Sequence, residues 1–333
     1  MSRSESIRFS AGATTLVGSL RLPLSPVDGV PVARWPVVAL LPSFLPRQRS
    51  GAYDRRGHQA WFGPAGPRSG LLARLGTRLA RHGVASFSWD QRGCGWSGGD
   101  WASVDLFTLV DDARDALAML RGRPDLDPAR VGLVGHGLGA LLALSVGAAD
   151  PAVGPLTLVG APARPLADVL RRAAATRSRR ARRGGPGERR HPLVEAMDRG
   201  LEELIERAER GEPAMTLPLR SGARERIGLR LWEQAFKAPG RALATLQRRS
   251  VTVVHAELDE WVDPAESRLL VAALREVPAA PRRWLVPGAG HDLAETGAGF
   301  LDSVAADLAA RLLPRSLPSV LLSITAEPPA AIR

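Results

Sequence analysis

Cysteine and lysine are nearly absent from this chain of 333 residues, and each scarcity limits what the protein can be. Cys94 is the only cysteine, which excludes an intramolecular disulfide and a zinc site built on paired cysteines. We expect neither a metal nor a cofactor. Lys237 is the only lysine among 45 basic residues, so arginine carries nearly all of the positive charge.

The chain also lacks an obvious targeting segment. Its first ten residues are polar and contain no apolar stretch typical of a signal peptide. Residues 131–149 carry no charge and approach the length of a membrane span, but glycines and His136 interrupt them. We interpret this run as a buried strand, turn and helix, and we expect a cytoplasmic protein without a membrane span.

The formal net charge of +11 is concentrated in residues 171–190. Against the single acid Glu188, this segment contains Arg171, Arg172, Arg177, Arg179, Arg180, Arg182, Arg183, Arg189 and Arg190. It has no interleaved aromatic residues and no nucleic-acid-binding motif. We therefore interpret it as a solvated segment and expect a small-molecule substrate or ligand, with no specific nucleic-acid partner.

Strand-like and helical patterns alternate through the first half of the chain. Residues 14–22, 36–41 and 84–89 are strand-like, whereas residues 70–82 and 105–121 place apolar residues at helical spacing. Strands separated by helices of about 10–15 residues are typical of a parallel sheet with helices on both faces. The predicted fold class is therefore α/β, a doubly wound and mostly parallel sheet.

This alternation stops in residues 163–245. The segment includes an amphipathic helix near residues 192–210 and no run that resembles a strand, so we predict a mainly helical insertion. Strand-like runs return at residues 251–255 and 283–286, and a final amphipathic helix covers about residues 299–313.

These patterns predict the domain organisation. Residues 1–162 and 246–313 form the α/β core, and residues 163–245 form a helical cap that carries the arginine-rich segment. Residues 314–333 are rich in proline and small residues and are predicted to be a poorly ordered tail.

One glycine-rich turn indicates chemistry. A loop at residues 124–128 leads into Val-Gly-Leu-Val-Gly-His-Gly-Leu-Gly-Ala, residues 131–140, and an apolar helix follows. Strand, G-x-x-x-G turn and helix are the context of a nucleophile elbow, whose middle residue is normally serine and is Gly137 here. A dinucleotide-binding turn would lie near the first strand, with an acid about twenty residues later, where this chain has Val159 and Gly160.

Three further segments resemble the α/β-hydrolase superfamily. Residues 87–97, Phe-Ser-Trp-Asp-Gln-Arg-Gly-Cys-Gly-Trp-Ser, resemble its D-x-R-G-x-G-x-S loop. Residues 254–264 resemble the strand end that presents the triad acid, here Asp259, and residues 286–292 resemble the loop that presents the triad histidine, here His291. The order nucleophile, acid, histidine is that of this fold. Within it, the sequence is most similar to serine aminopeptidase and dienelactone-hydrolase-like esterases with a helical cap.

The chain departs from the family pattern at a second place besides the elbow. Pro42-Ser43 replaces the usual His-Gly after the third strand. The resemblance implies that the oxyanion hole is formed by the main-chain N–H groups of Phe44 and Leu138, which do not depend on side chains. We expect Ser43 and His136 to line the same site.

Alternatives exist for the acid and for the nucleophile. Asp263, followed by Pro264, is a second candidate for the acid, and Asp259 is favoured. His136 is unfavoured as a substitute nucleophile because the neighbour of the elbow residue points away from the site in this fold. Cys94 is unfavoured because a buried, inert thiol is the commoner outcome.

Without a serine hydroxyl at position 137, the usual acyl-enzyme route is closed; in a well-studied serine protease, losing the nucleophile costs about 10⁶ in kcat. We predict an enzyme that acts on a small acyl or carbonyl compound through His291 and Asp259 as general acid and base, by non-covalent hydrolysis, elimination or cyclisation. Two alternatives remain open: a catalytically inactive binding protein, and a serine hydrolase inactivated by substitution at Gly137.

Overall fold

The computed structural model describes residues 2–24, 33–54, 70–182, 192–218, 222, 224–274 and 280–313. The predicted tail, residues 314–333, and residues 183–190 of the arginine-rich segment lie outside the described residues.

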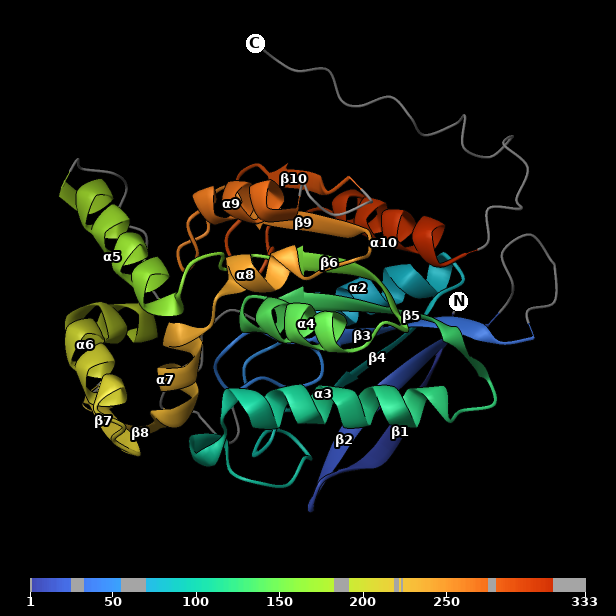
Figure 1. The fold of residues 1–333 in the computed structure, drawn as a ribbon, viewed down its shortest axis with the longest axis horizontal. Coiled ribbons are helices and arrows are strands. Elements are labelled where there is room, and N and C mark those ends of the chain that lie inside the picture. Colours follow the sequence, from blue (N-terminus) through green and yellow to red (C-terminus); the bar gives the residue numbers. More distant parts are fainter. Residues whose placement is uncertain are drawn as a thin grey trace, which may run out of the picture.

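One eight-stranded sheet organises the core, with strand order β1-β2-β4-β3-β5-β6-β9-β10 (Figure 1). Its strands are β1 (Ser2–Ala11), β2 (Thr14–Pro23), β3 (Trp35–Leu41), β4 (Ala85–Trp89), β5 (Leu126–His136), β6 (Val153–Val159), β9 (Val251–Ala256) and β10 (Arg282–Val286). β2 is antiparallel to both of its neighbours, β1 and β4, and every other neighbouring pair is parallel. The predicted mostly parallel α/β sheet is confirmed.

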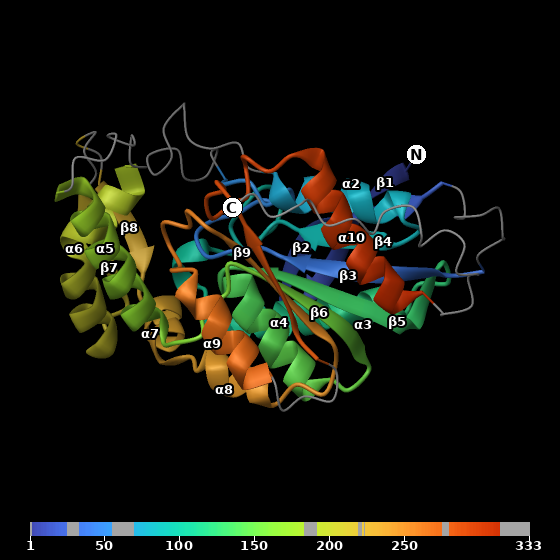
Figure 2. The same ribbon diagram turned by 90° about the horizontal axis from the view of Figure 1, so that it is seen from above.

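Helices cover both faces of this sheet (Figure 2). One face carries α2 (Leu71–Arg81) and α10 (Ala298–Leu312), and the other carries α3 (Leu106–Arg121), α4 (Leu138–Ala149), α8 (Gly240–Thr245) and α9 (Ala265–Leu274). α2 buries an apolar stripe that includes Leu72, Leu75 and Leu79, the spacing that predicts this helix. The central parallel strands are therefore buried on both faces.

A second group of elements lies beyond the carboxyl ends of the parallel strands (Figure 1). It consists of α5 (Leu166–Arg182), α6 (Pro192–Glu209), β7 (Ala214–Pro218), β8 (Arg224–Gly228) and α7 (Arg230–Lys237). A short 3-10 helix, η2 (Trp101–Ser103), contacts β8 from the core side. This group occupies the position expected for the cap.

Residues 163–245 are mainly helical, as predicted, but they also contain a pair of strands that the sequence did not indicate. β7 and β8 form an antiparallel pair, in which Met215 is opposite Ile227. In β7 the side chains of Met215 and Leu217 are buried, while Thr216 and Pro218 are exposed. Five residues hold too few alternations for this period-2 pattern to stand out from the helical sequence around it.

Two other elements differ from the sequence prediction. β1 was not predicted, because an edge strand with one solvated face keeps a polar sequence, and only Phe9 and Ala11 of β1 are buried. β5 begins at Leu126, inside the predicted loop; its pairing with β3 then shifts register before resuming at Val131. The residues in between form an irregularity within the strand rather than a separate loop.

The turn from β5 into α4 depends on two close backbone approaches. A Cβ atom on Gly135 would overlap the main chain of Gly139 and Ala140, and a Cβ on Gly139 would overlap the carbonyl oxygens of Leu41 and Pro42. Both glycines are therefore required by the packing of α4 against β3 and β5, as predicted for the glycines that flank an elbow.

We expect Gly135→Ala to lower the free energy of unfolding by about 1–3 kcal/mol or more, because the clash involves main-chain atoms that cannot rotate away. Gly299→Ala is the matched control: it lies in α10 with no atom within 4 Å of its added Cβ, and should leave stability within about 1 kcal/mol of the parent. Denaturant unfolding checks both, and equal effects would contradict the close approach.

Candidate active site

The candidate active site is formed by residues that follow the carboxyl ends of neighbouring parallel strands, where ligands bind in open α/β sheets. Ser43 and Phe44 follow β3, Gly137 and Leu138 follow β5, Gly160 follows β6, Asp259 follows β9 and His291 follows β10. The structure thus brings together the predicted site residues from segments up to 248 positions apart.

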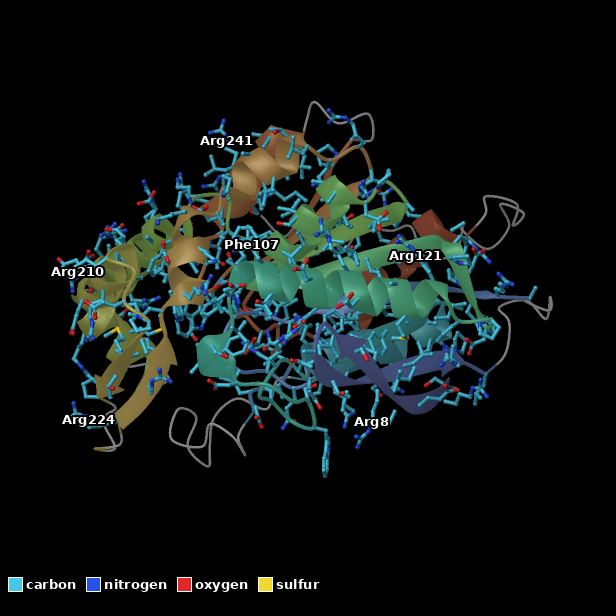
Figure 3. The ribbon with its side chains drawn as sticks, turned by 60° about the horizontal axis from the view of Figure 1, so that its bottom comes forward. Arg8, Phe107, Arg121, Arg210, Arg224 and Arg241 are labelled. Carbon is cyan, nitrogen blue, oxygen red and sulfur yellow. The ribbon has the colours of Figure 1, made fainter. Side chains whose placement is uncertain are left out.

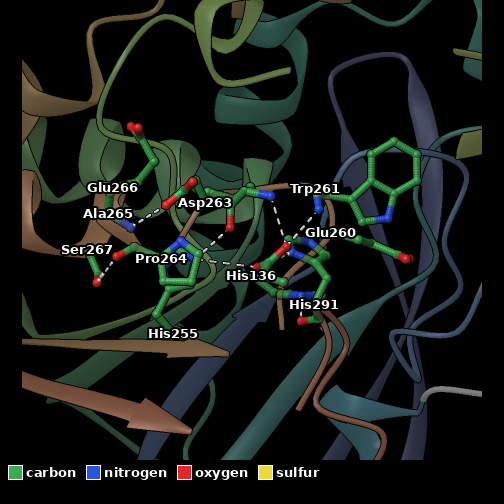
Figure 4. Close-up of polar contacts among 12 residues, drawn as sticks. His136, His255, Glu260, Trp261, Asp263, Pro264, Ala265, Glu266, Ser267 and His291 are labelled. Carbon is green, nitrogen blue, oxygen red and sulfur yellow. Dashed lines mark hydrogen bonds and ion pairs between the residues drawn. The ribbon is translucent and has the colours of Figure 1, made fainter. Parts of the chain in front are cut away.

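The pairing of acid and histidine is direct. His291 Nδ1 lies 2.8 Å from Asp259 Oδ2, and both side chains are buried. The other carboxylate oxygen of Asp259 accepts hydrogen bonds from the main-chain N–H groups of Trp261, at 2.9 Å, and Val262, at 2.8 Å (Figure 4). The alternative acid, Asp263, instead accepts from the N–H of Ala265. Of the two carboxylates, it is therefore Asp259 that contacts His291.

This contact sets the charge of both groups. Burial alone raises the pKa of Asp259, but the charge and hydrogen bond of His291 lower it more, so the pKa lies below its ordinary value. Burial alone lowers the pKa of His291, but the charge and hydrogen bond of Asp259 raise it above its ordinary value. The carboxylate is thus ionised and the imidazole is readily protonated.

The elbow keeps its backbone although it has lost its side chain. Gly137 has φ +53° and ψ −116°, and its N–H donates to the carbonyl of Val159 at 2.8 Å. α4 begins at the next residue, so the Leu138 N–H is one of the free donors at a helix N-terminus. Among the described residues, neither Leu138 N–H nor Phe44 N–H donates to a protein group. Both therefore remain available to an anionic oxygen.

Ser43 fills the space above Gly137. Its Oγ lies 3.2 Å from His291 Nε2, and the residue has no exposed surface. A Cβ atom on Gly137 would overlap Ser43 Oγ and would lie 3.1 Å from His291 Nε2. A serine at position 137 therefore does not fit unless Ser43 moves.

The sequence predicted that Ser43 lines the site but not that its hydroxyl contacts the histidine. The available signal was a paired exchange: glycine stands where the family has serine, and serine stands where it has glycine. Only the path of the loop after β3 shows that the two positions compete for the same space.

His136 supports the histidine loop from its side. Its Nε2 lies 3.0 Å from the main-chain oxygen of His291, and the two rings are 4.5 Å apart. Burial, followed by repulsion from His291, lowers the pKa of His136 to about 3, so its ring is neutral and donates to that carbonyl. The ring predicted to line the site is therefore engaged with the protein main chain.

A buried ion pair holds the next residue of the same loop. Arg47 Nη1 lies 3.0 Å from Asp292 Oδ1 and 2.8 Å from the carbonyl of Gly51, and its guanidinium stacks over Tyr53. The Arg47 side chain is 1% exposed. This pair ties the loop after β3 to the loop after β10, and so fixes Ser43 relative to His291.

His255 is a neighbour that the sequence reasoning missed. It lies in β9, with Nε2 2.9 Å from the Val262 carbonyl and 3.5 Å from Asp259 Oδ2. Burial lowers its pKa, and within the described part of the chain its Nδ1 has no hydrogen-bond partner. No motif marks it, because a single histidine inside an apolar strand does not reveal which loop residue it will face.

Cys94 does not fit a nucleophile. It is fully buried, and burial raises the pKa of its thiol above the ordinary value. A nucleophilic cysteine requires the opposite shift, because the thiolate is the reactive form.

Aromatic side chains cover the site. The Phe44 ring contacts Trp232 of α7 edge-on at 5.8 Å and Trp261 at 5.3 Å, and lies 6.2 Å from the His291 ring. Phe44, Trp232 and Trp261 are all buried. This aromatic cover (Phe44, Trp232 and Trp261) lies beside the His291 ring, which is itself buried.

The arginine-rich segment is partly structural. Arg171 pairs with Glu202 at 2.7 Å, and Arg177 pairs with Asp198, so both arginines join α5 to α6. Other arginines are spread over separate elements, as the labelled Arg8, Arg121 and Arg241 illustrate (Figure 3). Part of the local charge is therefore neutralised within the cap.

The described residues contain no group of three or more His, Cys, Asp or Glu side chains placed to hold a metal ion. A membrane-crossing helix, long and apolar enough to span a bilayer, is likewise not found among them.

Comparison with known proteins agrees with this fold. The family model described as serine aminopeptidase, S33, matches residues 65–295. Polyketide transferase ATR5 of Stachybotrys chlorohalonatus (strain IBT 40285) is 35% identical over 81 residues, which are 24% of this chain. The chain matches only 27% of the length of that relative.

Solved structures show the same fold at low sequence identity. The α/β hydrolase GrgF from Penicillium sp. sh18 superposes with a TM-score of 0.59 at 16% identity, covering 93% of this chain and 98% of that one. The Pyrococcus furiosus esterase Pf2001 has a TM-score of 0.57 at 13% identity, covering 94% and 92%.

Asp292→Ala should cost about 3–5 kcal/mol in the free energy of unfolding, because it leaves the buried Arg47 guanidinium without its counter-ion. The control is Asp302→Ala, whose side chain is 44% exposed beside His82 and should change stability by no more than about 0.5 kcal/mol. Thermal or denaturant unfolding measures both, and a neutral Asp292→Ala would show that the pair does not hold the two loops.

Proposed function

This chain belongs to the serine aminopeptidase S33 family of α/β hydrolases, and we propose that it is an enzyme acting on a small acyl or carbonyl compound with His291 and Asp259 as its acid–base pair. The observation that carries the proposal is the buried 2.8 Å contact between His291 Nδ1 and Asp259 Oδ2, with His291 Nε2 directed to the space above the elbow.

The charges on the pair define the active form of the histidine. Asp259 is ionised and can only accept, so Nδ1 of His291 carries the proton that joins them. In the neutral imidazole Nε2 is then the acceptor, and it can take a proton from a hydroxyl or a water. The charged form that results is stabilised by Asp259, as in other histidine-based acid–base sites.

Besides a proton acceptor, the reaction needs donors that stabilise negative charge, and main-chain N–H groups can supply them. The N–H groups of Leu138 and Phe44 would stabilise negative charge on a carbonyl oxygen as the reaction proceeds. The aromatic cover would exclude water and strengthen these hydrogen bonds by lowering the local dielectric. It also favours an apolar acyl group, because Phe44, Trp232 and Trp261 offer ring surfaces and no charge.

The relatives are compatible with acyl chemistry of this kind. Those named above include an esterase and a polyketide transferase. A purely binding role is less well supported, because the group above the elbow is a hydroxyl that contacts the histidine and not an apolar side chain that fills the site.

His291→Ala should reduce kcat/KM for a small activated ester such as p-nitrophenyl acetate by at least about 10²-fold, because the proton acceptor is lost. His82→Ala, at the C-terminal end of α2 where His82 lies beside Asp302, should retain the parental rate and controls for the loss of any histidine. A parental rate in His291→Ala would disprove the proposed function.

The pH dependence follows from the raised pKa of His291. Turnover needs the neutral ring, so kcat/KM should fall as the pH drops through a value above about 6.5, the ordinary histidine pKa. Asp259→Asn removes the charge that raises this pKa, so the acid limb should move to lower pH while the maximal rate drops. An acid limb that stays in place in Asp259→Asn would contradict the assignment.

A further inference from the structure

We propose that Ser43 is the nucleophile of this enzyme, presented to His291 by the loop after β3 instead of by the elbow residue. The inference rests on the proposed function, because it requires His291 and Asp259 as the acid–base pair. It adds a covalent step through a hydroxyl that does not come from position 137.

The hydrogen bonds of His291 with Asp259 and Ser43 run in the direction that activates a serine. Because ionised Asp259 accepts from Nδ1, the neutral His291 ring has its lone pair on Nε2. Ser43 Oγ, 3.2 Å away, is therefore the donor to Nε2. A serine is activated when its hydroxyl donates to a base and that base donates to an acid that orients it.

The hydroxyl of Ser43 lies directly above Gly137. A Cβ built on Gly137 would overlap Ser43 Oγ and would lie 3.1 Å from His291 Nε2. Ser43 thus places its oxygen in the space that the side chain of a serine at the elbow would enter, beside the same nitrogen of His291. Gly137 makes this possible, since any side chain there would displace the hydroxyl of Ser43.

With Ser43 as nucleophile, the N–H groups of Phe44 and Leu138 still supply one donor from the next residue and one from the opposite loop. In this fold one N–H comes from the residue after the nucleophile and the other from the loop after β3. Here the two loops exchange roles: Phe44 follows Ser43 in the chain, and Leu138 lies on the opposite loop. The same two N–H groups would serve both arrangements.

The reaction is acyl transfer through an ester of Ser43. Oγ bonds to the substrate carbonyl carbon as its proton passes to His291 Nε2, and the carbonyl electron pair moves to the oxygen held by Phe44 and Leu138 N–H. The intermediate collapses, and the leaving alcohol or amine takes the proton from His291. Water or another hydroxyl then attacks the ester, gives its proton to His291, and releases Ser43 with its proton restored.

The closed site limits which probe is suitable. Ser43 has no exposed surface and lies beneath the aromatic cover, so the reagent must be small. Phenylmethanesulfonyl fluoride is a small reagent that sulfonylates activated serines, and peptide mass mapping locates the modified residue.

The first experiment compares Ser43→Ala with the parent. We expect the parent to be labelled on the peptide containing Ser43, and Ser43→Ala to be unlabelled with kcat lowered by roughly 10³-fold or more. Ser86→Ala is the matched control, because Ser86 is also buried but lies within β4, and it should keep parental labelling and rate. A serine that merely capped the histidine would give no covalent adduct.

The second experiment exchanges the two residues. Ser43→Gly should lose the label, and the double variant Ser43→Gly/Gly137→Ser should regain it on the peptide containing position 137. The double variant also shows whether the cover admits the reagent. If it is labelled while the parent is not, Ser43 is not the nucleophile.

The outcomes separate this inference from the proposed function. If Ser43→Ala keeps the parental rate while His291→Ala is inactive, the nucleophile assignment fails and the acid–base role stands. If His291→Ala keeps the parental rate, the proposed function fails and the nucleophile assignment with it. Circular dichroism and thermal unfolding of each variant confirm that the comparison is between folded proteins.

Discussion

The space above the turn from β5 to α4 admits one side-chain hydroxyl, and the rest of the site depends on this limit. Gly135 and Gly139 bring α4 against the sheet, and so place residue 137 directly opposite the loop after β3. Two loops therefore compete for the same few ångströms beside His291 Nε2. In this chain Ser43 occupies the space, and the elbow residue Gly137 has no side chain.

The acid–base pair is maintained by burial as much as by contact. His291 and Asp259 are shielded from water, which makes their mutual attraction stronger than it would be on a surface. Each group alone would resist ionisation there, and together they favour it. His136, neutral for the same reason, supports the loop without adding a charge that would oppose protonation of His291.

The sequence was sufficient for the fold, and it named Asp259 and His291, whose side chains the structure places in contact. Local patterns are enough to recognise the alternation of strands and helices, the glycine-rich turn and the three family segments. These patterns can be recognised without knowledge of the tertiary contacts. The hairpin β7–β8, the edge strand β1 and the neighbour His255 could not be predicted, because short or isolated signals gain meaning only from what packs against them. The role of Ser43 was hidden for a related reason: a motif assigns one residue at a time, whereas position 43 has to be read together with position 137.

The overlap between a side chain at 137 and the hydroxyl of Ser43 constrains how such a site changes by mutation. A protein with serine at both positions has two side chains in one space, and a protein with glycine at both has no hydroxyl at all. A protein that changes from one arrangement to the other by single substitutions must therefore pass through one of two intermediates. One has serine at both positions and is crowded, and the other has glycine at both and no hydroxyl beside His291.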